Sequence, residues 1–159
     1  MTGPDGPTFE EYSEALADGI EAALPQWVVR SVERIMVAWT GSFPEDVAHA
    51  AHIVGDKAAG DVGGEIRRLL SSDIDEQWTT PLELVRGAVR YPSALLAELG
   101  APSGERDEFS VRHFPDDVYG LTPASIADLE PSLAETAMAW GAAKAFTHLR
   151  RHREPETGF

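Results

Sequence analysis

The sequence predicts an all-α protein, a compact single-domain bundle of six to eight helices, and three observations lead to this prediction. Apolar residues recur at spacings of three and four along several stretches, as they do on one face of a helix. Ser, Thr or Pro stands before these stretches and Gly follows several of them, where helix caps are expected. No stretch shows the period-two alternation of a strand or an Asn-Gly hairpin.

Two helices are predicted in the first part of the chain. Thr8 begins the string Thr-Phe-Glu-Glu, which has the spacing of a capping box and predicts a helix to about Ala23. Pro25 is predicted to start a new helix, because proline fits the first turn of a helix better than its interior. The apolar run from Trp27 to Trp39 predicts that this second helix is largely buried and ends at Gly41.

The middle of the chain predicts one long helix followed by shorter ones. Ser42 opens a second capping-box string, and an apolar stripe then runs from Val47 to Leu69. Glycines weaken this helix by about 1 kcal/mol each relative to alanine, so a kink or break is predicted near 60–64. The remaining helices are predicted over about 80–90, 93–99 and 106–113, with a short one from Thr122 and the last from Ser132 to about Arg153.

The folded part of the chain is expected to be one helical domain over residues 8–153. Residues 1–7 contain two prolines and two glycines with no periodic pattern, so a flexible N-terminal arm is predicted. Residues 154–159 are predicted to form a flexible tail.

Composition excludes several classes of function. The formal charge of −14, from 27 acidic and 13 basic residues, disfavours direct nucleic-acid binding, which draws on neutralised phosphates. The absence of cysteine excludes disulfides and cysteine-ligated zinc. No stretch approaches the roughly 18 apolar residues of a membrane span, and no secretory signal is recognisable, so no membrane association and a cytoplasmic location are expected.

The last predicted helix is rich in small residues. Ala137, Gly141 and Ala145 recur every four residues, a pattern that lets a second helix approach closely. This stripe either packs against the helix over 27–39 or forms a homodimer seam. The helix ends in a basic cluster, residues 148–153, and the first helix is acidic, which suggests that the two ends of the chain pair within a monomer or across a dimer.

One predicted helix face could hold a divalent metal. An advance of about 100° per residue places Glu45, His49, His52 and Asp56 on one side of the helix that follows Pro44. Imidazole and carboxylate groups are metal ligands, but a solvated polar face produces the same pattern. The sequence contains no H-E-x-x-H string that would favour the metal interpretation.

The loop over 114–123 is the second candidate site. Asp116 and Asp117 could act as an acid/base pair or as cation ligands near His113, and with Tyr119 they are predicted to form a partner or ligand surface. In the structural alternative, the two carboxylates cap a turn while Tyr119 and its apolar neighbours pin the loop to the core.

Two strings carry a resemblance. FPDDVYGLTPASIADL (114–129) and AWGAAKAFTHLRRHR (139–153) resemble a group of small all-helical actinobacterial proteins with no assigned function. The resemblance covers roughly the C-terminal half and implies an actinobacterial, cytosolic protein. It assigns no catalytic or binding residue.

These observations predict a non-enzymatic interaction or regulatory module that acts through protein-protein contacts, most simply as a homodimer. The alternative is a metal-binding domain or metal-dependent enzyme that uses His49, His52 and Asp56. A third hypothesis is an acidic mimic of nucleic acid that binds a basic partner through the face over 10–21. No phosphate loop, dinucleotide fingerprint or nucleophile elbow is present, so no cofactor other than a divalent metal is expected.

Overall fold

The computed structural model describes residues 8–76, 79–115, 117–121 and 123–153. Over these residues the chain is helical and contains no strand, so the predicted all-α fold is confirmed. The elements in chain order are α1 (Phe9–Thr40), α2 (Glu45–Ser71), the 3-10 helix η1 (Ile74–Glu76), α3 (Pro81–Gly87), α4 (Arg90–Glu98), α5 (Glu108–His113), the 3-10 helix η2 (Ile126–Asp128) and α6 (Leu133–Arg151). The predicted arm and tail lie outside the described residues.

Helix α1 is continuous through Pro25, so the predicted break at this proline is wrong. Its ends are as predicted: the Thr8 hydroxyl accepts from the Glu11 amide at 3.2 Å, and Gly41 takes a left-handed conformation with a φ of 80°. A proline inside a helix costs about 3 kcal/mol. The buried face continues on both sides of it through Leu24 and Val28, and that packing outweighs the local penalty.

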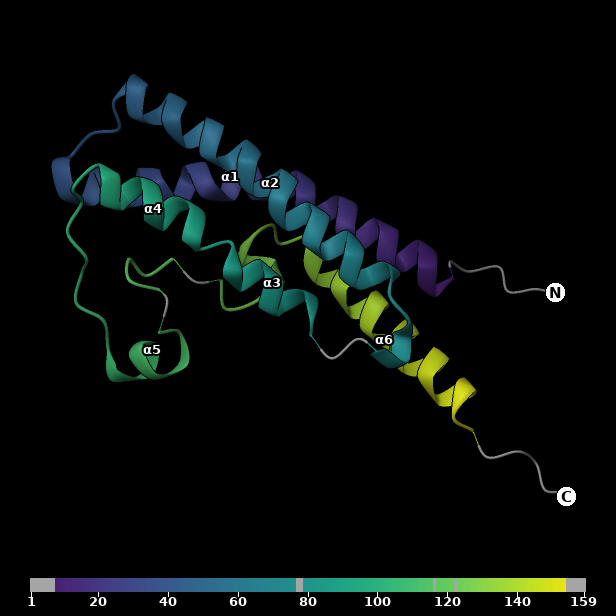
Figure 1. The fold of residues 1–159 in the computed structure, drawn as a ribbon. Helices are drawn as coiled ribbons and strands as arrows, with labels where there is room; N and C mark the ends of the chain where they lie inside the picture. Colours follow the sequence, from purple (N-terminus) through teal and green to yellow (C-terminus); the bar gives the residue numbers. More distant parts are fainter. Residues whose placement is uncertain (1–7, 77–78, 116, 122, 154–159) are drawn as a thin grey trace, which may run out of the picture.

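Helix α2 runs back along α1 and forms the largest contact of the fold (Figure 1). The predicted break near 60–64 is absent, because α2 is one continuous helix from Glu45 to Ser71. Two of its glycines lie against α1: a Cβ on Gly55 would meet the Pro25 carbonyl oxygen at 2.8 Å, and one on Gly63 would meet the Glu21 carboxylate. The predicted capping box at Ser42 is also wrong, since Pro44 is the N-cap and has no side-chain hydrogen bond.

Helices α3 and α4 cover α2 on one side. Pro92 lies in the first turn of α4, where its missing N–H has no helical partner to lose, and its side chain is buried. The Tyr91 hydroxyl donates to Asp61 of α2 at 2.7 Å, and Arg90 donates to Glu65 at 2.8 Å. These bonds fix α4 against α2 beside a core that includes Leu96.

A Tyr91→Phe substitution is expected to raise the pKa of the Asp61 carboxyl toward its ordinary value. The hydroxyl of Tyr91 is the main group that lowers this pKa, and Lys57 adds a smaller effect. Because the folded pKa lies below the unfolded one, the stabilisation is present above the unfolded pKa and is lost as pH falls through the folded value. Carboxyl carbon NMR titration of both proteins measures the change; an unshifted Asp61 would contradict the bond.

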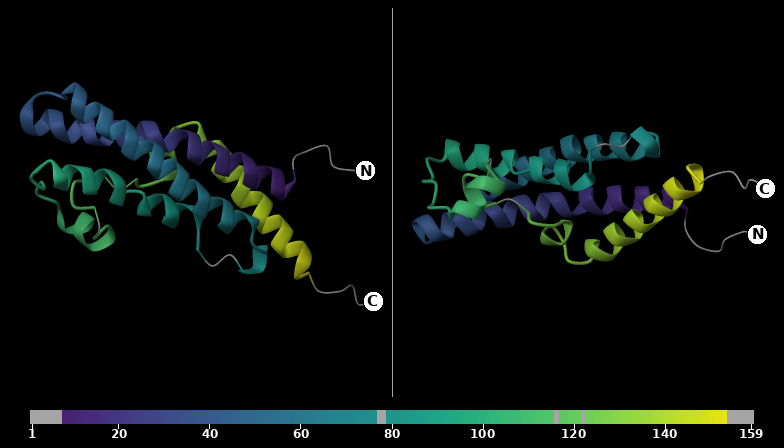
Figure 2. Two further views of the ribbon diagram at one scale, coloured as in Figure 1. Left: turned by 45° about the horizontal axis from the view of Figure 1, so that its top comes forward. Right: turned by 90° about the horizontal axis from the view of Figure 1, so that it is seen from below.

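Helix α6 lies on the opposite side of α1 from α3 and α4, and it crosses α1 at an angle (Figure 2). Its C-terminal end reaches η1, the short turn that follows α2. Among the helices described, none is long and apolar enough to cross a membrane.

Candidate functional site

The inner face of α6 docks on the N-terminal half of α1. The Trp140 indole N–H donates to the Ser13 hydroxyl at 2.9 Å, and its ring lies 6.0 Å from that of Phe9. Leu133 is buried against Gly19. The prediction placed the last helix against the stretch over 27–39, whereas these contacts join α6 to the first turns of α1, over residues 9–19.

The outer face of α6 is apolar and exposed. Met138, Phe146 and Leu149 have exposed fractions of 72%, 63% and 68%. Ala142 and Ala145 are exposed between them. At about 100° per residue these five side chains fall within an arc of roughly 100°, opposite Leu133 and Trp140. We call them the outer stripe of α6.

The small-residue seam predicted from the sequence is only partly on this face. Ala145 belongs to the outer stripe, whereas Ala137 and Gly141 are half-buried at its edge. Lys144 points the other way, with its ammonium 5.2 Å from the centre of the Trp140 ring. Most of the exposed apolar surface of α6 therefore comes from Met138, Phe146 and Leu149, not from the small residues on which the seam was predicted.

Two charged residues flank the outer stripe at opposite ends. Glu135 is exposed in the first turn of α6, and Arg150 is exposed in the last. The Arg150 guanidinium lies 5.8 Å from the centre of the Phe146 ring, over the apolar surface. The face thus has an acidic end and a basic end.

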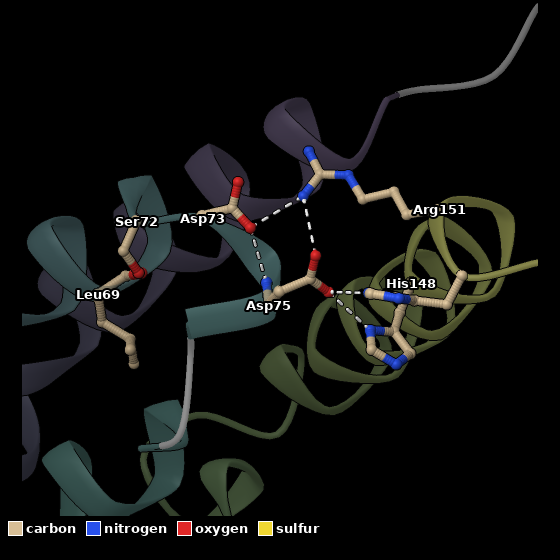
Figure 3. Close-up of polar contacts among 7 residues, drawn as sticks. Leu69, Ser72, Asp73, Asp75, His148 and Arg151 are labelled. Carbon is tan, nitrogen blue, oxygen red and sulfur yellow. Dashed lines mark hydrogen bonds and ion pairs between the residues drawn. The ribbon is translucent and has the colours of Figure 1, made fainter.

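A second cluster forms where α6 meets η1. His148 and His152 are four residues apart, and both imidazoles contact the same oxygen of Asp75: His148 Nδ1 at 2.9 Å and His152 Nε2 at 2.8 Å. Arg151 bridges Asp73 at 3.0 Å and the second oxygen of Asp75 at 3.8 Å. Figure 3 shows the Asp75 carboxylate between the Arg151 guanidinium and the His148 imidazole.

Hydrogen bonds from His152, and less strongly from His148, lower the pKa of the Asp75 carboxyl. Asp75 is therefore an anion over the physiological range. Within one chain, the basic end of α6 meets the acidic side chains of Asp73 and Asp75. The acids of α1 have another partner: Arg67 of α2 donates to Glu21, at 3.3 Å, and to Asp18.

A cleft of about 600 Å³ adjoins this cluster. Phe9, Leu70 and Ile74 give it an apolar part. Its charged lining is mixed and includes Arg67, Arg151, Glu10, Glu14 and Asp73. The cleft and the cluster share the turn that contains Asp73.

The predicted metal face on α2 is solvent-exposed. Glu45, His49, His52 and Asp56 are all exposed along one helix. Over the described parts of the chain, the one group of three metal-ligating side chains whose ligand atoms lie within 4.8 Å of one another is Asp75, His148 and His152. The convergent histidine-carboxylate cluster therefore lies between η1 and α6, where the sequence analysis predicted no metal ligands.

In the loop over 114–123, Asp117 and Tyr119 make the contacts expected if the loop has a structural role. Asp117 is buried, and its carboxylate accepts from the Leu121 amide, so it closes a turn rather than forming a surface. Arg106 donates to the carbonyl oxygen of Asp117 at 2.6 Å, and Tyr119 donates to that of Ala101 at 3.3 Å. Asp116 lies outside the described residues.

Comparison of the chain with family models, with curated proteins and with solved structures gives no match in any of the three. The function is therefore argued from the geometry of α6 and its surroundings.

Proposed function

We propose that this protein is a non-enzymatic interaction module that associates with a second copy of itself through the outer stripe of α6. The observation that carries the proposal is the exposure of Met138, Phe146 and Leu149 on one helix face. Single exposed apolar residues such as Ile53 are ordinary, but a contiguous exposed apolar face marks an interaction site. The face is formed by a helix whose opposite side is already docked, so it is presented on a fixed support.

A second copy is the occupant that the spacing and charge of the stripe favour. Spacings of four, three and four from Met138 to Leu149 are those of a helix that packs lengthwise against another helix. In an antiparallel pair related by a two-fold axis, Met138 of one copy lies opposite Leu149 of the other. The same register brings Glu135 within a helical turn of Arg150 of the second copy, so the two ends of the face are complementary.

The association is expected to be weak and dependent on concentration. One helix face buries less area than the roughly 800 Å² per partner of a standard stable interface. The net charge of −14 on each copy also opposes association. We expect a dissociation constant of roughly 10–100 μM, which would make the dimer sensitive to the amount of protein present.

Sedimentation velocity from about 5 to 500 μM tests the proposal, since this range brackets the expected constant. The weight-average sedimentation coefficient of the wild type is expected to rise toward that of a dimer. Met138→Glu/Leu149→Glu should stay monomeric, because each carboxylate would be buried in the apolar contact. Ile53→Glu is the matched control: Ile53 is 57% exposed on α2, away from α6, and its replacement should leave the dimer intact.

Reversing the charges of Glu135 and Arg150 tests the antiparallel arrangement of the two α6 helices. Glu135→Arg and Arg150→Glu should each weaken the dimer several-fold, because like charges then face each other at both symmetric positions. The double variant restores opposite charges and should recover wild-type association. A wild type that remains monomeric throughout the range, or variants that dimerise as it does, would refute the proposal.

A further inference from the structure

The geometry points to a binding site for a divalent transition-metal ion of the zinc class at Asp75, His148 and His152. This site goes beyond the proposed self-association, because it uses a different side of α6 and ties that helix to η1. No residue of the exposed histidine face of α2 belongs to this metal site.

The three ligand atoms already converge on one point. His148 Nδ1 and His152 Nε2 lie 2.9 Å and 2.8 Å from the same Asp75 oxygen, and all three atoms are within 4.8 Å of one another. Zinc ligands at about 2.0–2.2 Å in tetrahedral geometry lie about 3.4 Å apart. An ion can therefore enter after each contact opens by about half an ångström, a movement within the reach of exposed side-chain rotations.

The donor set selects the kind of cation. Two imidazole nitrogens and one carboxylate oxygen suit zinc and its neighbours, whereas calcium and magnesium prefer sites built entirely from oxygen. The histidines are four residues apart and their ring centres are 4.5 Å apart, so a single helix supplies both nitrogens in a fixed relation. Three protein ligands leave a fourth position that faces solvent, where water or a small ligand would bind.

Neighbouring residues orient the carboxylate. Arg151 lies near the other oxygen of Asp75, at 3.8 Å, and so leaves the first oxygen to the imidazoles. Its positive charge is opposed by Asp73, with which it forms a 3.0 Å ion pair. A ligating carboxylate held by a second group in this way is a common feature of protein metal sites.

The ligands come from distant parts of the chain, so binding should stabilise the fold. Asp75 is 73 residues before His148, and the ion would join η1 to the end of α6. An ion that binds only the folded state raises the melting temperature by about 5–10 °C at a hundredfold excess over its dissociation constant in a chain of this size. In the competing account the cluster binds no metal, and its hydrogen bonds to Asp75 only hold η1 against the end of α6.

Isothermal titration of Zn²⁺ into the full chain without an affinity tag, at about pH 7.5, tests the site. One equivalent should bind to the wild type. His148→Ala/His152→Ala should reduce the affinity about 100-fold or more, and Asp75→Asn, which keeps the side-chain shape, should weaken it as well. The control is His49→Ala/His52→Ala, which removes the other histidine pair and should bind as the wild type does.

Two further measurements separate metal binding from folding and from dimerisation. Co²⁺ bound at the site should give the visible absorption of a tetrahedral complex, which His148→Ala/His152→Ala should abolish while its circular dichroism stays unchanged. Repeating the titration in Met138→Glu/Leu149→Glu separates the site from the dimer. Failure of the wild type to bind Zn²⁺, or equal binding by His148→Ala/His152→Ala, would overturn the proposal.

Discussion

Trp140→Ala is expected to lower the free energy of unfolding by about 3–5 kcal/mol, the cost of removing a large buried aromatic side chain. Trp140 is 8% exposed and is the main anchor of α6 on α1. The substitution also leaves the buried hydroxyl of Ser13 without the indole N–H that it accepts from. The outer stripe would lose its fixed support, so self-association should weaken as well.

Urea unfolding followed by circular dichroism measures this loss. Trp140→Phe keeps most of the apolar contact and should lose less, since it removes the hydrogen bond and part of the ring. The control on the same helix is Met138→Ala, whose side chain is exposed in the monomer and whose effect should be within about 0.5 kcal/mol in dilute solution. A loss below about 1 kcal/mol for Trp140→Ala would mean that α6 does not depend on this anchor.

Gly55→Ala is expected to destabilise the protein by about 1–3 kcal/mol, although alanine is the better helix former. A Cβ at Gly55 would lie 2.8 Å from the carbonyl oxygen of Pro25 and 3.0 Å from its Cα. These are backbone atoms of a long helix, so α1 and α2 would have to move apart along their shared interface.

Gly60→Ala is the matched control for this prediction. Gly60 lies in the same helix, is exposed, and would place its Cβ in open space. Alanine there should stabilise α2 by about 0.5–1 kcal/mol through helix propensity and reduced freedom of the unfolded chain. The opposite signs of the two substitutions, measured by thermal or urea unfolding, test the contact; a stabilising Gly55→Ala would contradict it.

Local signals in the sequence predicted local structure well. The Thr8 cap and the Gly41 terminus follow from hydrogen bonds and backbone conformations within a few residues. Helix α6 starts after Ser132 as predicted, although the Ser132 side chain makes no capping hydrogen bond. The continuous helix through Pro25 could not be predicted in this way. It depends on a buried face that α2 covers, and local sequence does not contain the strength of that packing.

For the candidate sites too, the residue types could be read from the sequence, but their arrangement in space could not. The apolar and small residues of the last helix were visible in the sequence, but only the docking of Trp140 decides which face of α6 stays exposed. The meeting of Asp75 with His148 depends on how α2, η1 and α6 are arranged. The useful signal was the spacing of four between His148 and His152, which places both imidazoles on one side of a helix.

The central claim is that the outer stripe of α6 contacts a second copy of the chain, and disulfide cross-linking tests this contact most directly. The chain has no cysteine, so Ala142→Cys introduces a single thiol near the middle of the stripe. Two such thiols can be joined only when their Cα atoms come within about 7 Å. Mild oxidation should link Ala142→Cys into a dimer much faster than Ile53→Cys at the same concentration; equal rates for the two variants would contradict the claim.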